Sequence, residues 1–454
     1  MDVLTGIRLL SLLRRLRKRD KWTRQRLHEH QNEMLRKLRE YACATSPFYK
    51  EFHKGLANKP LHELPVLTKA VLMENFDELV TDRSVHLRDV EAHLSNLKGD
   101  ELFLDRYRVA ATSGSTGLRG FFLFNQSEWL TVLASFARAY EWAGGRPGVT
   151  RRIKTASIFS PVHWHVSRRV TESFKTPWLP SLYLPADDPL EKIVRDLNAF
   201  QPEMLACYTS IARILAKEQI AGSLNISPHH VLTGAEALTP DTRKRIEKAW
   251  GDGRLFDQYG ATEGGNMAAE CTRHEGLHLM EDLVIFEVVD RENRPVPAGA
   301  YGDKLLITVL FSRTQPLIRY ELSDSIRLAA GDCPCGRPFR RIRDIQGRME
   351  EMLCFPAVAG GEVTVNPVVF DQVMDTAPVG EWQVVHDAEG LNVFLSGVQE
   401  GHDDEMLRKA LHEALSDKRA VVPPIRIRRV PVIRRGATGK APLIKSKLRC
   451  VSAF

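Results

Sequence analysis

The chain has 454 residues, of which 43% are hydrophobic and 27% are charged, and its formal net charge is +7. This length exceeds that of one ordinary domain, and the composition is that of a globular protein with a sizeable core, which excludes a disordered or fibrous chain. Because no run of about 18 apolar residues occurs, we expect no membrane span.

The cysteines and the first residues favour a reducing compartment. Seven cysteines are scattered along the chain, an arrangement that predicts no disulfide framework. In the opening stretch MDVLTGIRLLSLLRRLRKRD the charges follow the apolar residues and no small-residue cleavage site comes after them, unlike in a secretory signal. We therefore expect a cytoplasmic protein.

The basic excess belongs to the N-terminal region. Residues 1–60 hold 15 Lys/Arg and 6 Asp/Glu, a net charge of +9, which leaves −2 for the remainder of the chain. Leucines at helical spacing are interspersed there with basic residues: Leu9, Leu12, Leu13 and Leu16, with Arg8, Arg14, Arg15 and Lys18. Such a helix either packs on its own domain with a solvated basic face or binds an anionic membrane surface or an acidic partner. No nucleic-acid-binding signature accompanies the charge, so we expect no nucleic-acid partner.

Further along the chain, the expected elements change character twice. A helix is predicted over residues 24–42, and short helices follow to about residue 76. LFLDRYRV, residues 102–109, is predicted to be a strand, and from about residue 105 strand-like runs alternate with helical ones. This alternation predicts a parallel sheet covered by helices. After Gly276 the pattern indicates β-strands joined by a Pro/Gly turn, and from about residue 348 strands and helices are mixed.

The stretch ATSGSTGLRG, residues 111–120, combines three glycines with four hydroxyl side chains. Glycines let the backbone approach a ligand closely, and hydroxyls with backbone N–H groups can hold phosphate oxygens. The loop is not the phosphate loop that ends in Gly-Lys-Ser/Thr, and its glycine spacing differs from the dinucleotide fingerprint. By itself it is either a phosphate site or a plain connection.

Other loops carry residues suited to binding a nucleotide: LTGAEAL (232–238), DQYGATEGG (257–265), PLIRYELSD (316–324), DIQGRMEEML (344–353) and RRGATGKA (434–441). In the second, an aromatic ring that can stack on a base precedes a carboxylate that can hold Mg²⁺. Asp324 could accept both hydroxyls of a ribose, and Lys440 follows a Gly-rich turn that can move its charge. Each segment alone has an ordinary alternative, a strand-end loop or an exposed lysine.

Taken in order, these segments resemble the adenylate-forming superfamily of acyl- and aryl-CoA synthetases, peptide-synthetase adenylation domains and firefly luciferase. YACATSPFYKEF, GLHLMEDLVIFEVVD, RTQPLIRYELSD and CPCGRPFRRI are similar to its phenylacetate–CoA ligase branch. The resemblance covers about residues 30–447 and implies an α/β fold. A large N-terminal domain, residues 1–347, would hold parallel-rich sheets sandwiched by helices plus a β-subdomain. A small mobile α+β domain, residues 348–454, would follow.

The resemblance implies a two-step reaction. A carboxylic acid attacks the α-phosphate of ATP to give an acyl-adenylate and pyrophosphate, and a thiol, usually that of coenzyme A, then displaces AMP. Mg²⁺ and positive side chains would neutralise the charge that builds up. We expect an aromatic or apolar acid, in a pocket near His163, Trp164 and Cys207.

The resemblance also implies a role for each matching residue. The β- and γ-phosphates would be held by Thr112, Ser113, Gly114, Ser115, Thr116 and Gly117. The adenosine would be bound by Gly234, Ala235 and Glu236 in the adenine pocket, by Tyr259 and Gly260 at the ring, and by Asp324 and Arg348 at the ribose. Thr262 would contact the α-phosphate, and Glu263 would bind Mg²⁺. Lys440 would bridge the carboxylate of the acid and the α-phosphate. The hinge of the mobile domain would lie at Glu350.

Two pairs of soft ligands form a candidate zinc site. Cys271 and His274 form C-x₂-H, and Cys333 and Cys335 form C-x-C about 60 residues later, with His278 as an alternative to His274. Free cysteines in turns are the other interpretation. Pairs at these places look like the structural zinc site of some phenylacetate–CoA ligase relatives, in which protein ligands fill all four positions.

Departures from the family pattern keep other functions open. Leu118-Arg119-Gly120 stands where Pro-Lys-Gly is common, Glu350 where Asp is usual, and Leu322-Ser323-Asp324 where Thr-Gly-Asp is usual. The acceptor could be a carrier-protein thiol or an amine, since a basic N-terminus suits an acidic carrier protein. A non-catalytic nucleotide-binding protein with a decayed site is the alternative from another class. A homodimer is also compatible with the sequence.

Overall fold

The structure is a computed structural model that describes residues 3–112, 118–146, 152–176, 179–348, 353–365, 369–370, 373–374, 377–433, 444–446 and 448. Its α-helices are α1 (Val3–Arg19), α2 (Arg24–Thr45), α3 (Pro47–Phe52), α4 (Lys69–Glu74), α5 (Phe76–Leu79), α6 (Leu87–Asn96), α7 (Gln126–Trp142), α8 (Val166–Phe174), α9 (Leu190–Phe200), α10 (Thr209–Ala221), α11 (Pro240–Trp250) and α13 (Asp404–Ser416), and Leu61–Glu63 form the 3₁₀ helix η1. None of the helices in these ranges is long and apolar enough to cross a bilayer.

The strands follow the predicted alternation with helices through the middle of the chain. They are β1 (Arg108–Ala111), β2 (Phe121–Phe124), β3 (Thr155–Phe159), β4 (Ser181–Pro185), β5 (Met204–Tyr208), β6 (His230–Gly234), β7 (Leu255–Ala261), β8 (Gly265–Glu270), β9 (Leu277–Leu279), β10 (Val284–Val289), β11 (Lys304–Val309), β12 (Tyr320–Leu322), β13 (Asp324–Leu328), β14 (Arg341–Arg348), β15 (Leu353–Pro356), β16 (Glu362–Val365), β17 (Glu381–Asp387), β18 (Gly390–Ser396), β19 (Ile425–Arg429) and β20 (Ile444–Ser446).

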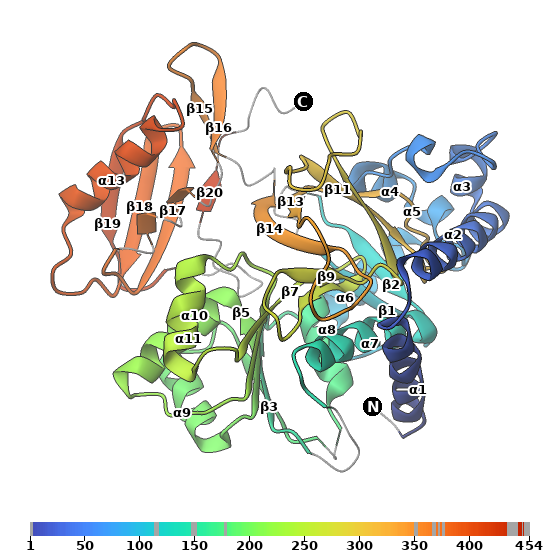
Figure 1. The fold of residues 1–454 in the computed structure, drawn as a ribbon, viewed down its shortest axis with the longest axis horizontal. Helices are drawn as coiled ribbons and strands as arrows, with labels where there is room; N and C mark the ends of the chain where they lie inside the picture. The colour runs from blue at the N-terminus through green and yellow to red at the C-terminus, as the bar shows by residue number, and fades with distance from the viewer. Residues whose placement is uncertain are drawn as a thin grey trace.

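A nine-stranded sheet forms the centre of the molecule, in the order β13-β14-β9-β8-β7-β6-β5-β3-β4. Strands β4, β3, β5, β6 and β7 are parallel, whereas β8, β9, β14 and β13 pair antiparallel (Figure 1). Since the carboxyl ends of the parallel strands meet at one edge, the loops that follow β5, β6 and β7 lie next to one another. The α/β fold expected from the sequence is therefore confirmed.

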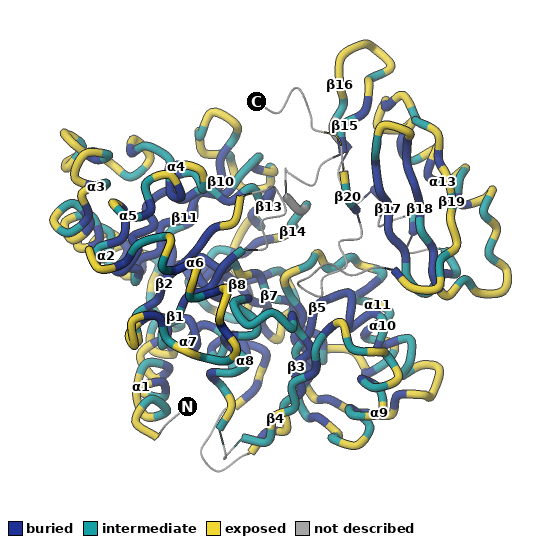
Figure 2. Tube along the Cα trace, turned by 180° about the vertical axis from the view of Figure 1, so that it is seen from behind, coloured by how far each residue is buried: buried dark blue, intermediate teal, exposed yellow. Residues whose placement is uncertain are grey.

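The parallel strands are apolar on both faces because helices cover both. Val231 of β6 and Leu255 of β7 pack in one cluster with residues of α9, α10 and α11. The next residues along these strands, Leu232 and Phe256, face the opposite way and pack with Tyr140 of α7. This change of face at each residue is the period of two of a strand. Figure 2 shows the resulting buried residues along the central strands.

Local signals in the sequence account for several helix boundaries. Asn125 accepts hydrogen bonds at the start of α7 while the Glu128 carboxylate returns to the Asn125 N–H, a capping box. Thr239 caps α11, whose first residue is Pro240. Gly222 ends α10 with a φ of 86°, the left-handed conformation that glycine adopts without steric cost.

The N-terminal helix packs on the large domain. Leu9, Leu13 and Leu16 are buried in the main core. The carboxylate of Asp20, directly after α1, accepts hydrogen bonds from the fully buried guanidinium of Arg138 and from the indole N–H of Trp142, both on α7. For the leucine stripe, packing on its own domain is thus the arrangement that occurs.

The strands beyond β14 belong to separate sheets. β15 pairs with β16, and a four-stranded sheet has the order β19-β18-β17-β20. Helix α13 packs on the latter sheet through Leu407, Leu411 and Leu415 in a core of its own. This mixed α+β unit stands beside the large sheet in Figure 1.

Two expectations need correction. The predicted strand over residues 102–109 is shorter, because Leu104 and Asp105 have positive φ values and form a turn before β1 begins at Arg108. Among the described cysteines, Cys354 on β15 is disulfide-bonded, whereas the sequence predicted reduced thiols. Cys43, Cys207, Cys271, Cys333 and Cys335 are free.

Candidate active site

The predicted phosphate loop forms the tip of a β-hairpin. Strands β1 and β2 pair antiparallel, and Thr112 and Gly120 close the base of the loop between them. The Thr112 N–H donates to the Gly120 carbonyl at 2.9 Å, and the Gly120 N–H donates to the Thr112 hydroxyl at 2.8 Å. Ser113, Gly114, Ser115, Thr116 and Gly117 lie outside the described residues.

The segment after β6 is shaped by close packing against β7. A Cβ atom on Gly234 would lie 2.8 Å from the carbonyl oxygen of Gln258, so only glycine fits there. Ala235 follows with a φ of 64°, a left-handed conformation that is uncommon for alanine and recurs at functional sites. The Glu236 carboxylate accepts a hydrogen bond of 2.8 Å from the backbone N–H of Ser210, in the first turn of α10. The segment expected at adenine is thereby fixed to the start of α10, directly after β5.

A tight turn between β7 and β8 holds Thr262 and Glu263. Both residues are buried: 9% of the surface of Thr262 and 4% of the surface of Glu263 are exposed. The turn requires glycine, because a Cβ atom on Gly260 would lie 2.6 Å from the carbonyl oxygen of Gly265. The Asn266 N–H donates to the Ser135 hydroxyl of α7 at 3.1 Å, which attaches the turn to the helix beneath it.

Two predicted site residues from distant segments are in direct contact. The Tyr259 hydroxyl on β7 donates a hydrogen bond of 2.8 Å to the Asp324 carboxylate at the start of β13. Both residues are buried. Asp324 also pairs in register with Arg348, the last residue of β14. The aromatic residue expected at adenine, the carboxylate expected at ribose and the arginine expected beside it therefore occupy one region of the sheet.

The structure thus assembles most of the described candidates at one edge. Gly234 pairs with Gln258, the neighbour of Tyr259, so the loops after β6 and β7 are adjacent. Tyr259 in turn binds Asp324. Lys440 and Glu350 lie outside the described residues, and their proximity to this edge stays a prediction.

Two contacts at the hairpin were not anticipated. The guanidinium carbon of Arg119 lies 4.6 Å from the centre of the Trp164 ring, in a cation–π contact. The Trp164 carbonyl also accepts a hydrogen bond of 3.1 Å from the Ala111 N–H. Cys207, by contrast, is fully buried in the core that holds α10, where burial raises its pKa. Arg119 and Trp164 are 45 positions apart, and no short-range pattern in the sequence predicts a contact over that separation.

A buried charge network lies behind the site. The Arg243 guanidinium on α11 donates to Glu270 at 2.6 Å, and the other oxygen of Glu270 accepts the Asp257 N–H at 3.0 Å. Burial, together with the Glu270 charge, raises the pKa of Asp257 to about 8. Asp257 therefore holds its proton more strongly than an exposed aspartate does, and it receives a hydrogen bond from the Thr233 hydroxyl at 3.3 Å. This network connects β6, β7 and β8 directly below the nucleotide segments.

A cluster of soft ligands lies at the antiparallel end of the sheet. The ligand atoms of Cys271, His278, Cys333 and Cys335 all lie within 4.8 Å of one another. The Cys271 and Cys333 sulfurs are 3.9 Å apart, and the Cys335 sulfur lies 3.3 Å from Nε2 of His278. A tetrahedral zinc ion with ordinary bond lengths would place two sulfurs about 3.8 Å apart and a sulfur and a nitrogen about 3.5 Å apart. The donor set and its spacing therefore fit zinc.

The fourth ligand differs from the predicted one. His274 sits in the turn after Cys271 with a φ of 52°, and its ring lies 4.7 Å from that of Phe256 with Nδ1 3.5 Å from Glu270. His278, the alternative named from the sequence, supplies the fourth ligand atom instead, because it lies on β9 between β8 and β14. His274 is thus replaced by His278 in the cluster.

The known proteins that the chain resembles include several acid–CoA ligases. No family model matches it. It is 27% identical to the phenylacetate–coenzyme A ligase of Thermus thermophilus over 81% of the chain and 80% of that enzyme. It is 30% identical to the phenylacetate–coenzyme A ligase of Pseudomonas putida over 62% of each.

A solved structure shows the same fold over almost the whole chain. The 2-hydroxyisobutyryl-CoA ligase, crystallised in the postadenylation state with an acyl-AMP, superposes with a TM-score of 0.73 at 20% identity, covering 94% of this chain and 91% of that one. The same kind of protein is indicated by the order of the motifs, by the contact between Tyr259 and Asp324, and by these relatives. The chain is thus similar in sequence to phenylacetate–CoA ligases, and it has the fold of a known acid–CoA ligase.

Proposed function

We propose that the protein activates a carboxylic acid with ATP to an acyl-adenylate, releases pyrophosphate, and transfers the acyl group to the thiol of coenzyme A. The observation that carries the proposal is the hydrogen bond from the Tyr259 hydroxyl to the Asp324 carboxylate. It joins the segment suited to adenine to the segment suited to ribose at the sheet edge where α/β proteins bind nucleotides. The named activity of the curated relatives supports the same reaction.

In this proposal, each described residue has a task that its surroundings allow. Tyr259 would present its ring to adenine, and the Asp324 carboxylate would accept the ribose hydroxyls. Thr262 would contact the α-phosphate. Glu263, a buried carboxylate in the turn after β7, would hold Mg²⁺, which supplies positive charge against the phosphates.

Two tasks fall on residues outside the described ranges. The hydroxyls and N–H groups of residues 113–117 would hold the β- and γ-phosphates, since Thr112 and Gly120 fix the ends of that loop. Lys440 would bring a compact positive charge to the carboxylate and the α-phosphate when residues 348–454 swing at Glu350. The boundary at residue 347 belongs to the same proposal.

The cysteine cluster would hold a structural zinc ion. Cys271, His278, Cys333 and Cys335 would fill all four positions, so no site is left for a substrate. The ion would link the end of β8 and strand β9 to the loop before β14, and so brace the sheet that contains β13 and β14.

The decisive assay is acid-dependent exchange of labelled pyrophosphate into ATP across a panel of aromatic and fatty acids. We expect exchange with at least one apolar acid, and loss of at least about a hundredfold in Lys440→Ala, as expected for a group that stabilises transition-state charge. Lys409→Ala, an exposed lysine on α13, is the matched control and should keep full exchange. Absence of exchange with every acid would support a decayed nucleotide-binding protein instead.

The acceptor is settled by product analysis after adenylation. Mass spectrometry should detect an acyl-CoA thioester when coenzyme A is supplied. Acyl transfer to an acyl-carrier protein or to an amine, with none to coenzyme A, would replace this part of the proposal with the alternative acceptor.

A further inference from the structure

Helix α1 is held on the body of the protein by ion pairs and by buried leucines. Arg17 forms a salt bridge of 2.5 Å with Glu141 of α7, and Arg19 pairs with Asp282 at 3.4 Å. Asp20 pairs with Arg138 at 2.5 Å. With three leucines of the inner face buried, α1 has a fixed orientation, and the opposite face is presented outward in a fixed direction.

The outward face divides into an apolar part and a basic part. Val3, Leu4 and Ile7 are exposed by 70%, 57% and 59%, an unusual degree for large apolar side chains. The following turns expose basic residues: Arg8, Arg14, Arg15 and Lys18. At 100° per residue, these side chains and the three apolar ones lie on the side of the helix away from Leu9, Leu13 and Leu16.

The charges on this face are available to a partner. Within the described part of the chain, none of Arg8, Arg14, Arg15 and Lys18 forms a salt bridge, unlike Arg17 and Arg19. Helix α1 contains no acidic residue. Since residues 1–60 carry a net +9 and the remainder carries −2, the positive potential is concentrated at this end of the molecule.

We propose that the outer face of α1 docks the enzyme on an anionic membrane surface. Exposed apolar side chains next to unpaired basic ones on one helix face match the boundary between acyl chains and anionic headgroups. Val3, Leu4 and Ile7 would enter the interface while the basic residues contact headgroup phosphates. The inference is independent of the proposed chemistry, because it concerns a helix that lies far from Tyr259 in the sequence.

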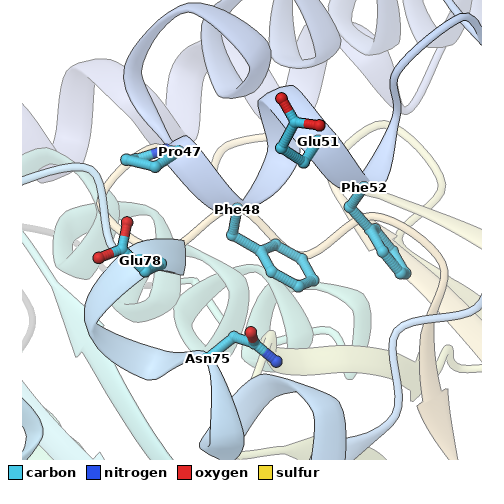
Figure 3. A pocket seen from close by; sticks show the side chains of 6 residues that line it. All are labelled: Pro47, Phe48, Glu51, Phe52, Asn75 and Glu78. Carbon is cyan, nitrogen blue, oxygen red and sulfur yellow. The ribbon is translucent and has the colours of Figure 1, made fainter.

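A second copy of the chain is the competing occupant. A pocket of about 510 Å³ between α3 and α5 is lined by the aromatic residues Phe48 and Phe52, by the acidic residues Glu51 and Glu78, and by Pro47 and Asn75 (Figure 3). Its charge would suit the basic face of α1. However, Glu51 is already paired with Lys54 at 3.1 Å, and the pocket is open and small beside a face that extends over several helical turns. The observations therefore favour the membrane.

The test is flotation of the full chain with lipid vesicles. We expect binding to phosphatidylcholine vesicles with about one-third phosphatidylglycerol, none to pure phosphatidylcholine, and a steep loss between about 0.1 and about 0.5 M NaCl. Arg14→Gln/Arg15→Gln should weaken binding about 30-fold. Arg36→Gln/Lys37→Gln removes the same charge from adjacent exposed positions of α2 and should leave binding unchanged.

The apolar contribution has its own pair of variants. Leu4→Ser/Ile7→Ser should weaken vesicle binding at least about tenfold, whereas Met406→Ser, an equally exposed apolar side chain on α13, should not. Unchanged melting temperatures keep the comparison valid. Equal binding of Arg14→Gln/Arg15→Gln and the unmodified chain overturns the proposal. So does a dimer in light scattering that Arg14→Gln/Arg15→Gln and Glu51→Gln/Glu78→Gln both abolish, since that result assigns the face to a second copy.

Discussion

The contact between Tyr259 and Asp324 gives the sharpest mutational test of the nucleotide site. Tyr259→Phe keeps the ring for adenine but removes the hydroxyl that donates to the Asp324 carboxylate at 2.8 Å. A hydrogen bond to a charged group contributes about 1.5 to 3 kcal/mol, so a loss near the lower value corresponds to about tenfold in kcat/KM for ATP. Because the hydroxyl acts by orienting Asp324, the effect should appear mainly in KM.

The assay is a double-mutant cycle on initial adenylation rates. Asp324→Asn should cost about a hundredfold, since it removes the charge expected to accept both ribose hydroxyls. Adding Tyr259→Phe to Asp324→Asn should then change little, which gives a coupling energy of about 1 to 2 kcal/mol. Tyr301→Phe is the matched control, because its hydroxyl also donates to an aspartate, Asp344, at 3.3 Å on the exposed surface. If the effects of Tyr259→Phe and Asp324→Asn simply multiply, the hydroxyl does not act through Asp324 and the reasoning fails.

Three further predictions concern the framework of the site. His278→Ala should lose about one zinc per chain in elemental analysis while His274→Ala retains it, and equal retention in both would exclude the proposed ligand set. The folded pKa of Asp257, about 8, lies above its ordinary value of 3.8, so the stability that the neutral carboxyl provides is present at low pH and is lost as pH rises toward 8. Asp257→Asn should therefore flatten the pH dependence of the free energy of unfolding over that range, and a profile unchanged from the unmodified chain would show that Asp257 is ionised in the fold. Arg138→Met should lower the free energy of unfolding by about 3 to 5 kcal/mol in denaturant titrations, because it removes the fully buried guanidinium that pairs with Asp20 and with the buried Asp282, whereas Arg36→Met on the exposed α2 surface should cost under about 1 kcal/mol. A small loss in Arg138→Met would mean that α1 is not held by that network.

The sequence predicted the parts of the fold whose signals are local. Alternating strand-like and helical runs identified β3, β5, β6 and β7 and the helices α9, α10 and α11. The strand predicted over residues 102–109 starts too early. Its apolar residues continue through a left-handed turn at Leu104 and Asp105, and the periodicity of the sequence does not reveal that turn.

Contacts between distant segments were beyond local patterns. The motif order placed Tyr259 and Asp324 in one site only through family resemblance, since 65 residues separate them. His274 lies in a turn and His278 lies on a strand, and only the ring of His278 is in the cluster with Cys333. The spacing of the two histidines along the chain does not encode this difference. The leucine stripe predicted the buried face of α1. The exposure of Ile7 depends on how the helix packs on the rest of the protein, which the sequence pattern does not give.

The most direct test of the shared nucleotide pocket is a crystal structure of the protein with AMP. The account predicts the adenine ring against Tyr259 and the ribose hydroxyls within hydrogen-bond distance of the Asp324 carboxylate. AMP bound on another surface, with the Tyr259 hydroxyl still on Asp324 and no nucleotide beside them, would contradict it.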